Sequence, residues 1–178
     1  MVELKLNALT EFFKTQGFQC QSLKATDKFP YDYLFVCLGE EEGGGGSFLQ
    51  LRVSKQDLGI KEDSEGFNKH GYYYLQFTIP MNVELKDSAV WELSRLILLV
   101  NLSNEIPGFE FNEIDKVVFY RYSQIVPGPA IDQYLLMTIV GNALSLIATF
   151  GDYIKDVASG KKTLKMVFDE FKKIQGKK

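Results

Sequence analysis

A long stretch of helical periodicity without charged side chains is the feature that most constrains this chain. Between Tyr134 and Phe150 the sequence has no Asp, Glu, Lys or Arg. Positions there and just beyond recur at spacings of three and four, which predicts one face of a helix about six turns long. That face consists of Leu135, Ile139, Asn142, Leu146, Phe150, Tyr153 and Val157. We expect the helix to begin at Pro129, which suits a first helical position, and to end at Gly160.

A helix this apolar either packs in a protein core or crosses a bilayer. The uncharged stretch has 17 residues, the lower limit of the length that spans a membrane. It contains Gly141, Asn142 and Ser145, and it lies between Asp132 and Asp152. We therefore do not expect a membrane span, and we predict a central core helix or a helix that lends one face to a partner subunit.

Two further helices are predicted, one at the start of the chain and one in its middle. The first covers residues 4–16, with Leu6, Leu9 and Phe13 on one face and Gly17 as its cap. The second follows the N-cap candidates Asp87 and Ser88 and runs to about Leu102. Its apolar positions are Val90, Leu93, Ile97 and Val100, widened by Leu96, Leu98 and Leu99. A face this wide indicates packing on more than one side.

The remaining apolar runs predict an antiparallel sheet of five to six strands. They cover residues 18–23, 31–38, 48–53 and 73–79, and a hairpin follows over residues 109–111 and 117–125. In the third run Leu49, Leu51 and Val53 alternate with polar residues, which indicates a sheet covered on one face. Pro80 is expected to close the fourth strand, and the polar residues 54–71 before it to form a surface loop. The fold class is α+β.

Length and composition indicate one intracellular domain with a helical appendix. The chain has 178 residues, of which 46% are hydrophobic and 24% charged, as in globular proteins. We assign residues 1–160 to a single α+β domain and residues 161–178 to a helical extension with a lysine-rich tail. Cys20 and Cys37 are the only cysteines, and the first ten residues do not resemble a signal peptide, so we expect a cytoplasmic protein.

The charges are unevenly distributed. The formal net charge is −3, but residues 155–178 carry eight lysines and three acidic residues, so the rest of the chain is acidic. An acidic body argues against nucleic-acid binding. We interpret the lysine-rich end as a solvated helix face and tail, while contact with an anionic membrane surface stays an alternative.

The glycine run does not form a known nucleotide-binding motif. Gly43–Gly46 is not followed by the Lys and the Ser or Thr of a phosphate-binding loop, and its spacing is not that of a dinucleotide site. We interpret it as a flexible hairpin tip. The run Gly43–Ser47 also resembles an inserted flexible linker.

No complete catalytic or metal-binding set is present in the sequence. The single histidine, His70, could pair with a cysteine, but we expect Cys37 to act as a small hydrophobic residue in an apolar strand. Asp152 and Asp156 lie one helical turn apart without a His or Cys companion. We therefore predict no cofactor, no metal site and no enzymatic activity.

Exposed aromatic side chains are the candidates for a partner-binding surface. In the run Tyr72–Tyr74, strand alternation turns one tyrosine to the core and leaves Tyr72 and Tyr74 for a surface. The candidate surface comprises Tyr72, Tyr74, Trp91, Tyr120 and Tyr122.

Residues 90–157 carry a family resemblance. The segment LILLVNLSNEIPGFEFNEIDKVVFYRYSQI, followed by a long helix, resembles the type III secretion chaperone-like superfamily, including the bacterial YbjN family. In that family a helix ends in an Asn, a short gap leads to a Gly, and two strands precede a long closing helix. The matching positions are Asn101, Gly108, Phe111, Val118 and Tyr120. The resemblance covers the last half of the chain well and the first half only in element order, and its motif carries no catalytic residue.

The resemblance implies a non-enzymatic domain that holds an extended segment of another protein. A homodimer through apolar faces of the second or last helix is left open. The alternative function is a small-ligand sensor or enzyme with a pocket between the sheet and the long helix, where Asn142 or Tyr153 would be polar anchors. The long 54–71 segment and the lysine-rich end depart from the family pattern.

Overall fold

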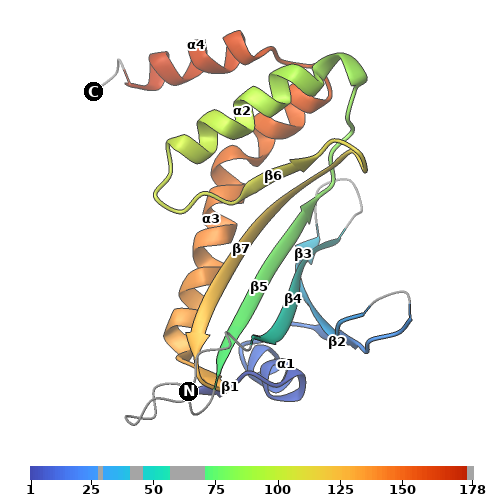
Figure 1. Ribbon diagram of the computed structural model, residues 1–178. Helices are drawn as coiled ribbons and strands as arrows, with labels where there is room; N and C mark the ends of the chain where they lie inside the picture. Colours follow the sequence, from blue (N-terminus) through green and yellow to red (C-terminus); the bar gives the residue numbers. More distant parts are fainter. Residues whose placement is uncertain (28–29, 41–45, 57–70, 176–178) are drawn as a thin grey trace. The chain divides into compact units, whose positions relative to one another are not determined.

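The computed structural model describes residues 1–27, 30–40, 46–56 and 71–175 of the chain (Figure 1). The predicted glycine-rich tip at 43–45, most of the predicted loop and His70 lie outside these ranges. The chain divides into two compact units. The first unit comprises Met1–Ile79 and Arg121–Gly141, and the second comprises Pro80–Tyr120 and Asn142–Lys178.

The described residues have the predicted α+β fold. Six of their strands form one antiparallel sheet in the order β2-β3-β4-β5-β7-β6, with an N-terminal, a middle and a long C-terminal helix packed on it. The strands of this sheet are β2 (Cys20–Leu23), β3 (Tyr33–Glu40), β4 (Gly46–Gln56), β5 (Tyr72–Met81), β6 (Phe109–Asn112) and β7 (Val117–Pro127). The helices are α1 (Leu6–Thr15), α2 (Val90–Leu102), α3 (Gln133–Ala158) and α4 (Leu164–Gln175), and the short 3-10 turn η1 (Asp87–Ala89) precedes α2.

In the first unit, α1 packs against one face of the sheet. Leu9 and Phe13 are fully buried, as their spacing predicts, and Gly17 closes the helix with φ of +89°. Strand alternation sends a row of side chains to the same face. These are Leu34, Val36, Leu49, Leu51, Leu75 and Phe77, each at most 1% exposed. The expectation of a sheet covered on one face is confirmed for this unit.

The strand and helix bounds differ from the predicted ones at several places. β4 extends to Gln56, into the predicted loop, and β5 runs one residue past Pro80 because Met81 still buries its side chain. Helix α3 begins at Gln133 and not at Pro129. The residues between are taken by β8 (Ala130–Ile131), which pairs with β1 (Val2–Glu3) in a separate two-stranded sheet.

Asp132 starts α3 by capping it. Its Oδ1 accepts hydrogen bonds from the backbone N–H groups of Tyr134 at 2.8 Å and Leu135 at 3.0 Å. A carboxylate at this position satisfies N–H groups that have no partner within the helix. The physical start of the helix is therefore this aspartate, which follows a backbone pairing that local periodicity does not reveal.

In the second unit, α2 packs beside β6 and is connected to α4. The Phe109 ring packs edge-on against Tyr120, with ring centroids 5.4 Å apart, and against Phe150 at 6.3 Å. The backbone N–H of Leu164 donates to the Glu92 carboxylate at 3.0 Å, which fixes the start of α4. Gly160 ends α3 with φ of +71°, so its predicted role is confirmed.

The buried face of α3 differs from the predicted face. Its buried positions are Leu136, Ile139, Val140, Ala143, Gly151, Ile154, Val157 and Ala158. Leu135 is 43% exposed and Asn142 is exposed, so the prediction that both lie on the packed face is wrong. Apolar residues cover more than one side of the helix, so their periodicity alone does not single out the side that packs.

By length and composition, α3 is the one helix among the described residues that could cross a membrane. Only 28% of its most apolar window is buried. Its exposed side nevertheless carries the polar Thr138, Asn142, Ser145 and Thr149.

Candidate functional site

The face of the first unit's sheet opposite α1 carries aromatic and polar side chains. The register places Gln21 opposite Phe35, Phe35 opposite Gln50, and Cys37 opposite Phe48. Directly opposite residues in antiparallel strands project to the same face, so these side chains share one surface. The open face of β2, β3 and β4 therefore presents apolar rings where strand alternation would favour polar residues.

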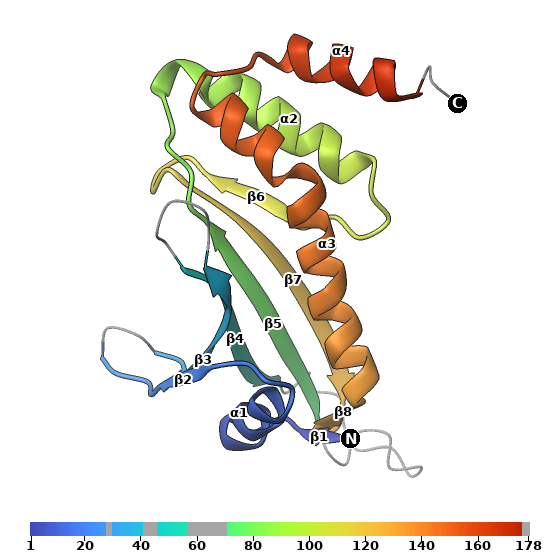
Figure 2. The same ribbon diagram turned by 180° about the vertical axis from the view of Figure 1, so that it is seen from behind.

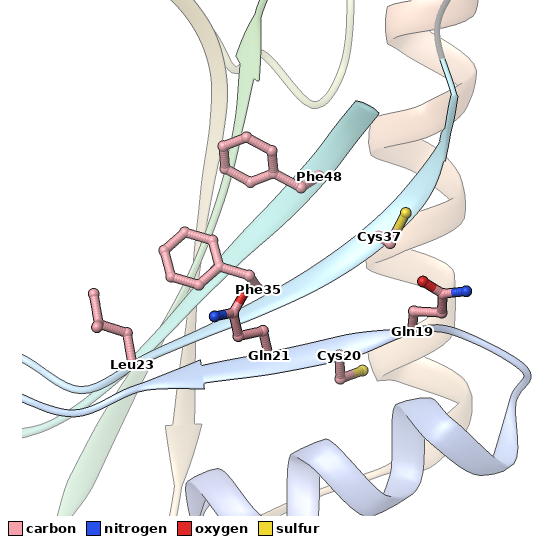
Figure 3. Close-up of a pocket in the computed structure, with 7 residues that line it drawn as sticks. All are labelled: Gln19, Cys20, Gln21, Leu23, Phe35, Cys37 and Phe48. Carbon is pink, nitrogen blue, oxygen red and sulfur yellow. The ribbon is translucent and has the colours of Figure 1, made fainter. Parts of the chain in front are cut away.

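These side chains border a shallow groove of about 500 Å³ (Figure 3). The rings of Phe35 and Phe48 pack edge-on with centroids 5.6 Å apart. Leu23 and Phe48 are each 38% exposed, a large fraction for apolar side chains. The residues that line the groove are Gln19, Cys20, Gln21, Leu23, Phe35, Cys37 and Phe48. Figure 3 shows Gln21, Phe35 and Phe48 on one side of the strands and Cys20 on the other, toward α1.

The groove adjoins an edge of the sheet that the described residues form, because β2 is the first strand in its order. The backbone N–H of Cys37 donates to the carbonyl of Gln19 at 2.8 Å, so Gln19 and Cys37 form a hydrogen-bonded pair. Hydrogen-bonded and non-hydrogen-bonded pairs alternate in an antiparallel ladder. The N–H and C=O groups of Cys20 and Ser22 therefore point away from β3, toward the open edge.

Arg52 provides a positive charge on the same face. Its guanidinium lies 4.4 Å from the centre of the Tyr31 ring, and its buried Nε has no hydrogen-bond partner among the described residues. It borders a polar hollow of about 280 Å³ together with Ser54, Tyr74, Gln76 and Ser123. The open face thus changes from apolar near β2 to polar near β5.

An ion pair lies just after β2, at a separate hollow that residues at the start of α1 also line. Lys24 contacts Asp32 at 2.6 Å, and Asp32 also accepts the backbone N–H of Ala25 at 2.8 Å. The Lys24 ammonium, followed by this N–H, holds the pKa of Asp32 below its usual range.

The two cysteines differ in exposure and not as the sequence predicts. Cys37 is exposed on the open face, so the expectation of a buried thiol is wrong. Its position alternates with the buried Val36, which sends it to the opposite side of the strand. Cys20 is partly buried, and this burial raises the pKa of its thiol. Neither thiol has a described histidine beside it, because His70 lies outside the described ranges.

The predicted surface tyrosines of the first unit do not share one face of its sheet. Tyr72, Tyr74 and Tyr122 belong to the first unit and are partly buried, and Trp91 belongs to the second. Tyr122 lies on the covered face, its ring centroid 6.4 Å from that of Phe77. Tyr74 lines the polar hollow beside Arg52.

Tyr120 cannot belong to a binding surface, since it is 1% exposed. Alternation along β7 turns Val118 and Tyr120 to the core of the second unit. The residues that the sequence analysis missed are Leu23, Phe35 and Phe48. Strand alternation could have identified them. Each of the three residues alternates with polar or core positions along its strand, so each side chain lies on the face that is expected to be polar.

A second hollow, of about 650 Å³, lies within the second unit beside α3 and α4. The Tyr153 and Phe171 rings contact each other at a tilt of 56°, with ring centroids 4.9 Å apart, and the Lys162 ammonium lies 5.2 Å from the Tyr153 ring centre. The residues that line it are Ser103, Thr149, Phe150, Tyr153, Phe168, Phe171 and Lys172. Asn142 is not among them. Within the described ranges, no group of three or more His, Cys, Asp or Glu side chains could hold a metal ion.

Comparison with known proteins does not assign a family. No protein-family model matches the chain. No curated protein matches it either. Inferences about function therefore rest on the groove, the free edge of β2 and the second hollow.

Proposed function

We propose that this chain is a non-enzymatic protein-binding domain that holds an extended segment of a partner protein, as a chaperone or an adaptor does. The proposal rests on two features that lie side by side in the first unit, the edge of β2 and the groove. The outward N–H and C=O groups of Cys20 and Ser22 lie beside a groove lined by Leu23, Phe35 and Phe48. An extended segment needs both elements, one for its backbone and one for its side chains.

The binding mode follows from strand geometry. A segment that pairs with β2 extends the sheet by one strand, and its backbone bonds satisfy groups that are unpaired at the edge. Every second side chain of the added strand projects to the open face, next to Leu23 and Phe35. Covering a half-exposed Leu or Phe contributes about 1 kcal/mol each. The segment we expect is therefore apolar at alternate positions.

The finer proposal is that the fold belongs to the type III secretion chaperone-like superfamily, and to its YbjN-like family. Two observations support it: the resemblance of residues 90–157, and the observed order of helix, strands, helix, hairpin and long helix. It would place the protein in the cytoplasm and is consistent with a function that depends on protein contacts. A fold of this kind does not by itself identify a partner.

The experiment uses peptides selected from a displayed library of random ten-residue segments, measured by fluorescence anisotropy with the full chain. Ser22→Pro removes the outward N–H of β2, a change that an edge strand tolerates because this N–H does not pair with β3. We expect it to weaken binding about tenfold or more, while Ser22→Ala keeps the N–H and binds as the wild type does.

A second variant tests the groove. Phe48→Ser should weaken the same peptides about tenfold, whereas Tyr134→Ser, which alters an aromatic side chain 76% exposed on α3, should leave affinity unchanged. The proposal fails if the selection yields no binders, or if the selected peptides bind the Ser22→Pro and Phe48→Ser proteins with unchanged affinity.

The second candidate function is a small-ligand sensor or enzyme. The hollow beside Tyr153 favours it, since 650 Å³ and an aromatic lining with few polar groups are typical of ligand pockets. A thermal-shift screen of metabolites tests it. A saturable rise in Tm that Phe168→Ala reduces and Phe48→Ser leaves intact would support this function over peptide binding.

A further inference from the structure

A polar hollow of about 280 Å³ lies on the open face of the first unit's sheet, across β4, β5 and β7. These strands are consecutive in the sheet order, and both views show them side by side (Figure 1 and Figure 2). The register places Arg52 opposite Gln76 and Ser54 opposite Tyr74, so these side chains project to the same face. The Gln76 amide nitrogen lies 3.5 Å from the Ser123 hydroxyl, which brings β7 into the same cluster.

Arg52 provides a positive charge that no described residue neutralises. Its guanidinium lies over the Tyr31 ring, 4.4 Å from the ring centre, and has no ion pair within the described ranges. Its Nε is buried without a hydrogen-bond partner there. An unpaired buried donor costs free energy, and a bound ion or water is a common partner for such a group. A ring that contacts the flat face of a guanidinium leaves its N–H groups, which lie in the plane, able to donate to an anion.

Acidic residues are absent from the strand segments that surround the hollow. Residues 48–54 of β4, 72–78 of β5 and 121–125 of β7 contain no Asp or Glu, although the chain has a net charge of −3. Asp32, which follows Tyr31 in the chain, is paired with Lys24 at 2.6 Å. The charge around the hollow therefore favours a negative ligand.

We propose that the hollow binds a phosphate group, either as free phosphate or as a small phosphate monoester. Its lining offers a guanidinium, three hydroxyls and an amide, all of which can donate hydrogen bonds. A carboxylate has two acceptor oxygens, whereas a phosphate monoester has three and carries between one and two negative charges at neutral pH. The planar donors of arginine also match two phosphate oxygens at once. Phosphate therefore fits this donor set better than a carboxylate does.

This inference does not rest on the proposed function. The hollow and the apolar groove share no lining residue, although both open on the same face of the sheet. The Phe48→Ser protein, in which we expect weak peptide binding, should therefore bind phosphate as the wild type does. Loss of peptide binding and loss of phosphate binding can thus be told apart in one set of proteins.

The test is an NMR titration of the ¹⁵N-labelled full chain with phenyl phosphate, inorganic phosphate and benzoate. At about 20 mM NaCl, where screening is weak, phenyl phosphate should bind with a Kd on the order of 1 mM or tighter. The Arg52 side-chain N–H signal should shift and saturate. Benzoate has the same ring with a carboxylate and should bind at least about tenfold more weakly. Tighter binding of phenyl phosphate than of inorganic phosphate identifies a monoester as the ligand, and the reverse order identifies free phosphate.

Three variants locate the site. Arg52→Lys keeps the charge but loses the planar donors, so it should weaken phenyl phosphate about tenfold or more. Ser123→Ala removes one hydroxyl at an exposed position, and should weaken it about threefold even if the Arg52→Lys protein does not fold. Thr78→Val is the matched control, because it removes a hydroxyl from β5 that does not line the hollow. Its affinity should be that of the wild type.

Three results would overturn the proposal. One is a titration in which phenyl phosphate causes no saturable shift. Another is benzoate binding as tight as that of phenyl phosphate, which would mean that the site does not recognise the phosphate group. The third is a Ser123→Ala protein that binds phenyl phosphate as tightly as the Thr78→Val protein does.

Discussion

The side-chain amide of Asn101 forms hydrogen bonds with both the C=O and the N–H group of Phe109. Its Nδ2 donates to the Phe109 carbonyl at 2.7 Å, and its Oδ1 accepts the Phe109 N–H at 3.1 Å. The same oxygen accepts the N–H of Gly108 at 3.2 Å. An amide is the side chain that both donates and accepts in this way, as a neighbouring strand would. The last turn of α2 is thus fixed to the first residue of β6.

Replacing Asn101 by Ala should destabilise the protein by about 2 kcal/mol. Three hydrogen bonds to partly buried backbone groups are lost at once, and the groups of Phe109 are left without that partner. Urea unfolding of the two proteins measures the difference. Asn101→Asp keeps the acceptor and loses the donor, so its free energy of unfolding should lie between the two.

Asn104→Ala is the matched control for this change. Asn104 Nδ2 donates to the carbonyl of Val100, a bond within one helical turn that does not connect two elements. Its loss should lower the free energy of unfolding by about 1 kcal/mol or less. If Asn101→Ala lowered the free energy of unfolding no more than Asn104→Ala does, the hydrogen bonds of Asn101 to Gly108 and Phe109 would not stabilise the second unit.

Cys37 should react with thiol reagents much faster than Cys20. The first thiol is exposed at the groove, while the second is partly buried and has a pKa raised by that burial, which lowers its thiolate fraction at neutral pH. Labelling with Ellman's reagent should therefore be biphasic, and Cys37→Ser should remove the fast phase. A slow phase lost in the Cys37→Ser protein would contradict the described exposure.

The same thiol reports on the groove. A peptide that occupies the groove beside Phe35 and Phe48 should slow the reaction of Cys37. Modification of Cys37 with a bulky maleimide should in turn weaken the peptide. Equal rates with and without saturating peptide would place the peptide elsewhere.

Local sequence signals predicted the elements that depend on local contacts. The spacing of Leu9 and Phe13 identified α1 and its buried face, because both bury on the same side of one short helix. The hairpin of β6 and β7 was likewise predicted, since its strands are joined by a short polar turn. Such patterns work where one face of an element is apolar and the other polar.

The predictions were wrong where contacts between residues far apart in the sequence determine the structure. Val2 pairs with Ile131, and this pairing delays the start of α3 beyond Pro129. No local pattern carries a contact between residues this far apart. The packed face of α3 was misassigned for a related reason. Apolar residues cover more than one side of this helix, and only the contacts with neighbouring elements select the side that includes Leu136.

The groove was missed because Phe35 and Phe48 were not assigned to either face of their strands. Phe35 and Phe48 fall on the open face by alternation with Leu34 and Leu49, which are fully buried. Tyr120 was misassigned in the opposite direction, as a surface residue, although Val118 two positions away shares its face. Assigning each strand's two faces before choosing candidates would have corrected both errors.

Acid should destabilise the wild-type protein more than an Asp32→Asn variant. The pKa of Asp32 is lowered in the folded state by Lys24 and by the N–H of Ala25. A lowered pKa contributes stability that is present above the unfolded value of about 3.9 and is lost as the pH falls through the folded value. Tm measured from pH 6 down to about pH 2 should therefore fall more steeply for the wild type.

Salt supplies the control for the acid experiment. Asp32 is exposed to solvent, so the ion pair with Lys24 is screened and its contribution should shrink at about 1 M NaCl. The other carboxylates titrate in both proteins, and the comparison isolates Asp32. Parallel Tm curves at low salt would show that this carboxylate does not stabilise the folded state.

Replacement by alanine should have opposite effects on the free energy of unfolding at two glycines of the α3 region. Gly160 ends the helix with φ of +71°, a conformation that strains any residue with a Cβ, so Gly160→Ala should lower the free energy of unfolding by about 1 kcal/mol or more. Gly141 lies inside the helix with open space around its Cα, so Gly141→Ala should raise it by up to about 1 kcal/mol. Gly160→Asn should be milder than Gly160→Ala, because Asn tolerates the left-handed region. Urea unfolding measures all three, and a stabilising Gly160→Ala would mean that α3 does not end in a left-handed residue.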